Sequence, residues 1–260
     1  SESTIYIPRL DDPHVNLPHG KVENQLHELF KTTANPTSEQ LSKILGSPSK
    51  RKDKTKLDKN VKPTSYAELR KMLEWGITNS DQSDWYDAFG DGFRNLVGDP
   101  NIWEAAVIFG ITSQQNAAEM NYADTLHVMA LARQHDPVND PAGFEQALRT
   151  TPKPEGHGRL KIQGSQIKGI INFYKTGIKE GGLKTTTYMQ MVHDRGFNIF
   201  NPFSVQDVHM SRAFGYRYTD VDKDTDNVVD AAKFPSDKAI RYGMYLTTKL
   251  ANEYNMRPDQ

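Results

Sequence analysis

The 260-residue chain contains no cysteine, which excludes disulfides and cysteine-ligated metal sites. The same absence fits a reducing, cytoplasmic setting. No run of roughly 18 apolar residues occurs, so the sequence predicts no membrane-spanning helix. The first residues also lack the charged and apolar regions of a secretion signal. We therefore expect a cytoplasmic protein that does not partner a membrane.

The sequence also has no excess of charge of either sign. Its 32 lysine and arginine residues stand against 33 acidic residues, and the net charge is −1. This balance argues against a protein that coats nucleic acid, because such proteins carry a strongly basic surface. It does not exclude an enzyme with one local basic groove.

Familiar cofactor and metal motifs are missing as well. The chain has neither the GxxxxGK[ST] nor the GxGxxG fingerprint of nucleotide-binding loops, and its histidines form no HExxH pattern. The aspartates of Asp220–Asp226 alternate as in a calcium loop, but Thr225 and Ala231 stand where that loop needs glycine and glutamate. We interpret this stretch as a solvated acidic loop, and we expect no metal and no bound cofactor.

What the sequence does contain is apolar residues at helical spacing, whereas the alternation typical of strands is scarce. This pattern predicts an all-α fold. The helices are expected at 22–31, 36–45, 65–75, 85–96, 101–110, 121–133, 144–148, 165–179, 187–192, 208–214 and 237–254.

A basic, apolar-poor segment at 47–63 suggests a boundary between two parts of the chain. Segments of this composition are usually flexible linkers, and the alternative is an arm that grips phosphates. We expect residues 1–62 to be an N-terminal arm with short helices and this basic linker. Residues 63–260 are expected to form the main helical domain.

A polar run of Thr112, Ser113, Gln114, Gln115 and Asn116 follows the most apolar predicted helix. Amides buried without partners are costly, so this run is either a surface turn or a cluster that contacts something polar. Amide side chains suit the edges of bases and the gap left by a displaced nucleotide. The five residues are therefore candidate contacts to DNA.

A glycine-bearing loop, Gly156–Gly158, precedes the helix that starts near Ser165. Glycines beside basic residues before a helix can present backbone N–H groups to a phosphate, although a plain interhelical loop explains the same pattern. The candidate phosphate-binding residues are Gly158, Arg159, Lys161 and Lys168.

Asp207 stands directly before a short predicted helix that carries His209 and Arg212. A helix N-cap is one interpretation of Asp207, and a catalytic carboxylate is the other; one aspartate can serve both roles. His209 and Arg212 are candidate DNA contacts. Arg212 alternatively pairs with a nearby carboxylate.

Three segments in this order resemble motifs of the helix-hairpin-helix DNA glycosylase superfamily: Ile111–Asn116, Gly156–Ile171 and Val205–Arg212. The resemblance covers roughly Trp103 to Tyr216. It implies a glycosylase-like helical fold, a target nucleotide flipped out of the duplex, and Asp207 as the catalytic aspartate. The family's Leu-Pro-Gly-Val-Gly hairpin and its lysine nucleophile have no counterpart at Tyr188–Asn198, so we expect a divergent or missing hairpin and no Schiff-base mechanism.

The chain is more similar to a divergent bacteriophage branch of this superfamily, the amino acid:DNA transferases, also described as glutamyl- or putrescinyl-thymine pyrophosphorylases. Asn116, Asn121–Ala123 and Asp207–Ala213 carry this similarity. It implies a hypermodification enzyme that transfers an amino acid or polyamine onto phosphate-activated 5-hydroxymethyluracil in DNA. The partners implied are DNA containing modified thymine, the amine donor as co-substrate, and a functional link to a 5-hydroxymethyluracil DNA kinase. Asp207 would be the general base.

Two alternatives stay open from the sequence. One is a monofunctional DNA N-glycosylase that excises a modified or damaged base, and the other is a non-catalytic DNA-binding or phage structural protein. Both enzyme functions require the polar run, the glycine loop and Asp207 to act on the same nucleotide.

Overall fold

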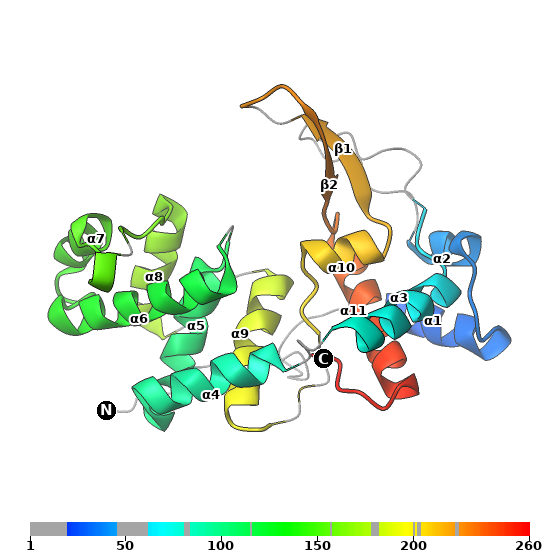
Figure 1. The fold of residues 1–260 in the computed structure, drawn as a ribbon, viewed down its shortest axis with the longest axis horizontal. Coiled ribbons are helices and arrows are strands. Elements are labelled where there is room, and N and C mark those ends of the chain that lie inside the picture. Colours follow the sequence, from blue (N-terminus) through cyan, green and yellow to red (C-terminus); the bar gives the residue numbers. More distant parts are fainter. Residues whose placement is uncertain are drawn as a thin grey trace. The chain divides into compact units, whose positions relative to one another are not determined.

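The computed structural model describes residues 20–45, 62–80, 84–114, 116–156, 158–177, 182–199, 201, 204–221 and 224–260. Across these ranges the protein is predominantly helical, as the sequence predicted (Figure 1). The chain divides into two compact units. Of the described residues, 84–201 belong to the first unit, and 20–80 together with 204–260 belong to the second.

The first unit is built around α5 (Ile102–Thr112), which is buried continuously from Ala105 to Thr112. A helix that is apolar on every side must be covered on every side, and four neighbours contact it. They are α4 (Trp85–Val97), α6 (Ala118–Gln134), α8 (Gly164–Thr176) and α9 (Leu183–Gly196). The unit also contains α7 (Pro141–Thr150) and the 3₁₀ turns η1 (Asp99–Asn101) and η2 (Pro154–Gly156).

One polar cluster links α5 to α6 and α8 near the start of α5. Glu104 on α5 accepts a hydrogen bond from the Tyr174 hydroxyl of α8 at 2.5 Å and pairs with Arg133 of α6 at 2.6 Å. Burial raises the pKa of Tyr174, and the neighbouring Glu104 carboxylate raises it further. The tyrosine therefore stays a neutral donor, and it helps to fix the three helices against one another.

Helices α4 and α9 approach closely where a glycine of each meets the other. A Cβ atom added at Gly90 of α4 would lie 2.5 Å from the backbone nitrogen of Gly196. One added at Gly196 would overlap Cδ1 of Ile102. A larger residue at either position would have to push the helices apart, so these glycines set the distance between α4 and α9.

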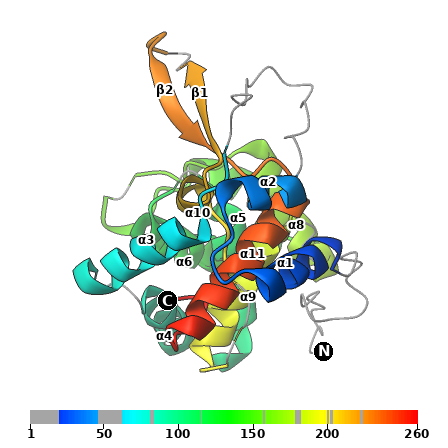
Figure 2. The ribbon, with the colours of Figure 1, turned by 90° about the vertical axis from the view of Figure 1, so that its right-hand side faces the viewer.

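The second unit packs α1 (Lys21–Thr32), α2 (Ser38–Leu45) and α3 (Tyr66–Asn79) with the C-terminal α11 (Asp237–Glu253); Figure 2 shows α1 and α2 beside α11. Glu23 of α1 also pairs with Arg241 of α11 at 2.9 Å. The shared core comprises Val22, Leu26, Leu41, Ile44, Tyr66, Leu69, Phe214, Tyr216, Phe234, Ala239, Tyr242, Leu246 and Leu250.

This core divides the chain differently from the boundary that the sequence suggested after residue 62. The predicted helices at 22–31 and 36–45 exist, but they are not an appendage, because their apolar sides are buried against α11. The basic segment suggested the boundary by its composition, whereas the packing partner of α1 lies near the other end of the chain. Residues 47–61 of that segment lie outside the described residues.

Among the described residues, the β-structure is an antiparallel hairpin in the second unit, with β1 (Arg217–Val221) paired to β2 (Val228–Ala232). Arg217 is opposite Ala232, and Val221 is opposite Val228; Figure 1 shows the two strands side by side. The acidic loop expected at Asp220–Asp226 is therefore shorter, since Asp220 and Val221 belong to a strand. The β-branched residues on both sides favour strands, and the aspartates between them hid that signal.

The segment Tyr188–Asn198, which was compared with the family's hairpin, includes most of the helix predicted at 187–192. The structure places this segment within α9 up to Gly196, where Met189, Met191 and Val192 are buried. The connection between α8 and α9 lies earlier, at 177–182, and its residues 178–181 are outside the described ranges.

We predict that Gly90→Ala destabilises the protein by about 1–3 kcal/mol, the usual cost of overpacking a filled interior. Gly76→Ala is the matched control, because this α3 glycine has no atom within 4 Å of an added Cβ. The control should instead add about 0.5–1 kcal/mol through helix propensity. Urea unfolding measures both, and equal effects of the two substitutions would contradict the close approach of α4 and α9.

Candidate functional site

The polar run begins at the buried end of α5, of which Thr112 is the last residue. The last carbonyls of a helix have no partner inside it, and here side chains supply the donors. Ser113 Oγ donates to the Gly110 carbonyl at 2.8 Å, Asn121 Nδ2 to Phe109 at 2.9 Å, and Gln166 Nε2 to Ile111 at 3.0 Å. Thr112 Oγ1 lies 2.8 Å from the Ile108 carbonyl oxygen and 2.5 Å from Oδ1 of Asn121.

Of the five residues in the run, Gln114 alone is both described and exposed. It has no hydrogen-bond partner among the described residues, and Gln115 lies outside them. Thr112 is buried, and Ser113 is half-buried with its hydroxyl engaged. Gln114 is therefore the described amide of the run that is free to contact a ligand.

Asn116 joins the run to a buried ion pair. Its Nδ2 donates to Asp124 Oδ2 at 2.9 Å, and Asp124 Oδ1 accepts from Lys153 Nζ at 2.7 Å. Both charged side chains are only 5% exposed. The sequence did not predict this pair, because its members are 29 positions apart. The one indication in the sequence was an aspartate among the inward-facing residues of α6, where an acid needs a partner.

The same lysine begins the glycine loop. The backbone N–H of Lys153 donates to the Gly158 carbonyl at 2.7 Å, which closes the loop on itself. Gly156 and Gly158 have φ angles of +75° and +76°, a region that residues with a Cβ rarely adopt. Asn116, Asp124, Lys153 and Gly158 thus form one chain of contacts from the polar run to the loop.

Three cations follow the loop on an exposed surface. Arg159, Lys161 and Lys168 are all solvent-exposed, and within the described residues none has an ion-pair partner. The helix that carries Lys168 is attached to α5 through the buried Gln166 amide. The structure therefore brings two of the three predicted segments together in the first unit, through Gln166 and through the buried contacts of Asn116, Asp124 and Lys153.

Asp207 lies in the second unit and caps α10 (Val208–Ala213). Its Oδ1 accepts from the backbone N–H of Met210 at 2.9 Å, so the N-cap interpretation is confirmed. Oδ2 has no hydrogen-bond or ion-pair partner among the described residues, and the side chain is half-buried. One oxygen of Asp207 thus caps the helix, and the other can accept a hydrogen bond or a proton from a ligand.

His209 and Arg212 lie on the same short helix. His209 is exposed, and Arg212 is half-buried with an Nε atom that has no hydrogen-bond partner. The alternative prediction for Arg212 was an ion pair with a nearby carboxylate, and no such pair occurs among the described residues. Whether Asp207, His209 and Arg212 act on the same nucleotide as the first-unit surface stays a prediction.

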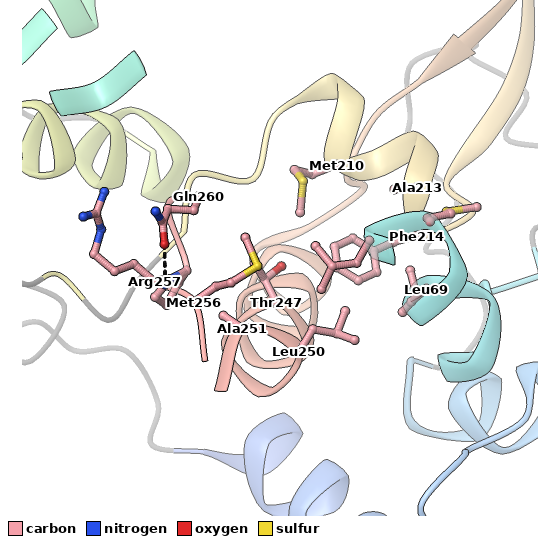
Figure 3. Close-up of a pocket in the computed structure, with 13 residues that line it drawn as sticks. Leu69, Met210, Ala213, Phe214, Thr247, Leu250, Ala251, Met256, Arg257 and Gln260 are labelled. Atoms are coloured by element: carbon pink, nitrogen blue, oxygen red, sulfur yellow. Dashed lines mark hydrogen bonds between the residues drawn. The ribbon is translucent and has the colours of Figure 1, made fainter. Parts of the chain in front are cut away.

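A pocket of about 220 Å³ in the second unit borders α10 on the side of Met210 and Ala213 (Figure 3). Its wall is mainly apolar and includes Leu69 and Leu250, and its polar members are Thr247, Arg257 and Gln260. The Thr247 hydroxyl on this wall already donates to the Gly243 carbonyl at 2.7 Å. A nucleobase needs several polar partners, so this pocket does not have the lining of a base-binding site.

In the part of the chain that is described, no group of three or more histidine, aspartate or glutamate side chains is arranged to hold a metal ion. None of the described helices has both the length and the apolar composition that crossing a membrane requires.

We predict that Lys153→Met lowers the free energy of unfolding by about 3–5 kcal/mol, because it leaves Asp124 buried and unpaired. Adding Asp124→Asn should recover most of this loss, since it removes the stranded charge and keeps an oxygen for Asn116. Urea unfolding of both variants tests the pair. A single variant within about 1 kcal/mol of wild type would show that Asp124 is not buried as described.

Comparisons of the chain with protein-family models, with curated proteins and with solved structures gave no match. The likeness to the glycosylase superfamily is therefore a resemblance of three short sequence motifs.

Proposed function

We propose that the protein modifies bases in DNA by transferring an amino acid or amine onto phosphate-activated 5-hydroxymethyluracil, with Asp207 as the general base. The observation that carries this proposal is that the two oxygens of the Asp207 carboxylate differ in their contacts. Oδ1 is held by the Met210 N–H, and Oδ2 has no partner among the described residues. A fixed carboxylate with one available oxygen is suited to take a proton from an incoming amine. The proposal includes a glycosylase-like helical fold with a divergent hairpin.

The proposed reaction needs no cofactor. The amine nitrogen attacks the exocyclic methylene carbon, a C–N bond forms, and the C–O bond to the phosphate or pyrophosphate breaks with its electron pair leaving on oxygen. The proton released by the amine goes to Asp207. Arg212, whose buried Nε has no hydrogen-bond partner among the described residues, and exposed His209 lie on the same helix as each other. In the proposed reaction they offset charge on the leaving group.

The first-unit surface supports binding to DNA. Arg159, Lys161 and Lys168 are exposed and unpaired within the described residues, and Gln114 projects an amide with no protein partner. Such cations bind backbone phosphates, and an amide can fill the stack vacated by a flipped base. A DNA kinase acting on 5-hydroxymethyluracil would supply the activated substrate.

We predict that Asp207→Asn lowers the transfer rate about 10²–10⁴-fold, because asparagine keeps the cap but cannot accept the proton. The substrate is duplex DNA containing 5-hydroxymethyluracil, treated with its kinase and ATP and then with amino acids and putrescine. Asp140→Asn is the matched control: Asp140 caps α7 by accepting from the Gly143 N–H at 3.0 Å, and its replacement should leave the rate unchanged.

Mass spectrometry of the nucleosides separates the candidate functions. A heavier nucleoside supports the transferase, and abasic sites that depend on Asp207 would indicate a monofunctional glycosylase instead. If wild-type protein forms neither product, both enzymatic functions are wrong and a non-catalytic DNA-binding role remains.

We predict separately that removing Lys161 and Lys168 together weakens DNA binding and lowers the salt slope of the binding constant. The slope should fall by about 0.9 for each DNA phosphate that the protein no longer neutralises. Lys43→Ala with Lys71→Ala is the control, since it removes the same charge from exposed positions on α2 and α3. Fluorescence anisotropy at several salt concentrations measures the slopes. Equal slopes for the two double variants would show that the loop and α8 do not contact the DNA backbone.

A further inference from the structure

The position of Asp207 depends on how α10 is held, because α10 has only six residues. A helix of this length is not stable by itself in water, so tertiary contacts must fix it. The structure shows contacts at both ends of α10, all within the second unit.

At its C-terminal end, α10 is attached to the segment before α3. Thr64 donates twice, from Oγ1 to the Ala213 carbonyl at 2.6 Å and from its backbone N–H to the Phe214 carbonyl at 3.1 Å. Gly215 follows with a φ angle of +91° and no room for a side chain against the Lys62 carbonyl. This end is fixed mainly by backbone groups.

At its N-terminal end the contact is made by Gln206, the residue before Asp207. Gln206 is 2% exposed, and its Nε2 donates to Ser204 Oγ at 2.7 Å and to Thr247 Oγ1 of α11 at 3.2 Å. The Thr247 hydroxyl gives its own proton to the Gly243 carbonyl at 2.7 Å, so its oxygen is oriented to accept from Gln206.

Gly243 provides the space for this side chain. A Cβ atom at position 243 would lie 2.5 Å from Gln206 Oε1. That oxygen is buried without a hydrogen-bond partner. An apolar side chain of the same size would fill this space without burying an unsatisfied oxygen. We therefore attribute the role of the Gln206 amide to its directional hydrogen bonds and not to packing.

We infer that Gln206 is a positioning residue, whose carboxamide fixes the Asp207 carboxylate relative to α11 through Thr247 and Gly243. The inference deepens the proposed function and depends on it for its catalytic consequence. The structural part stands separately, because it concerns how firmly the start of α10 is held.

The test uses Gln206→Met, which keeps the length of the side chain and removes its hydrogen bonds. Gln190→Met is the matched control, since Gln190 is also a buried glutamine that donates through Nε2 and has an unpartnered Oε1. Hydrogen exchange at the Met210 amide, which donates to Asp207 Oδ1, should become about 10-fold faster in Gln206→Met and stay unchanged in the control. Unchanged exchange in both would overturn the inference, whatever the activity of the protein.

In the transfer assay, Gln206→Met should lower kcat about 10–100-fold with an unaltered KM for DNA, since misplacing a catalytic group acts on the chemical step. Thr247→Val should lower kcat in the same direction, and Thr247→Ser, which keeps the hydroxyl, should restore it; this pair carries the test if Gln206→Met does not fold. A kcat at the wild-type level in both Gln206→Met and Thr247→Val would refute the positioning role. Wild-type protein without activity would refute the proposed function instead, and the exchange measurement would still decide how α10 is held.

Discussion

The buried carboxyl end of α5 is the constraint on which the first unit depends. Each carbonyl left unpaired there would cost about 1–3 kcal/mol, and three different segments supply the donors: Ser113, Asn121 of α6 and Gln166 of α8. These bonds fix α6 and α8 against the C-terminal end of α5. Glu104 fixes the same two helices near the start of α5, through its contacts with Tyr174 and Arg133. The polar run is consequently structural at Thr112, Ser113 and Asn116, and Gln114 is its described residue that is free to bind.

The helices were predictable because a single segment contains its own periodicity. Continuous apolar composition identified α5 as central, and Asp207 was recognisable as a cap from its place before α10. Contacts between distant segments were not predictable in this way. No local pattern indicates that Val22 and Tyr242 share a core, or that Lys153 lies against Asp124. The hairpin shows the same limit on a smaller scale, because pairing between β1 and β2 is not visible in either five-residue strand alone.

The capping role of Asp207 does not compete with a chemical role, because the two use different oxygens. A cap restrains the side chain to one rotamer, and a restrained carboxylate loses less entropy when a substrate arrives. Asp140 has the same capping geometry on α7. What distinguishes Asp207 is its surroundings, with Arg212 on the same helix and Gln206 anchored on α11 immediately before it.

The net charge of −1 is a poor guide to what the surface binds, because many cations are already neutralised by partners. Examples are Arg94 with Asp99, Arg133 with Glu104, Arg149 with Glu145, Arg195 with Asp87 and Arg241 with Glu23. Screening limits electrostatic interactions to about 8–10 Å at physiological salt, so a phosphate responds to the charges nearest to it. Arg159, Lys161 and Lys168 have no such partners within the described residues, and they give the first unit a local positive field. An overall balance of charge is therefore compatible with binding to DNA at this surface.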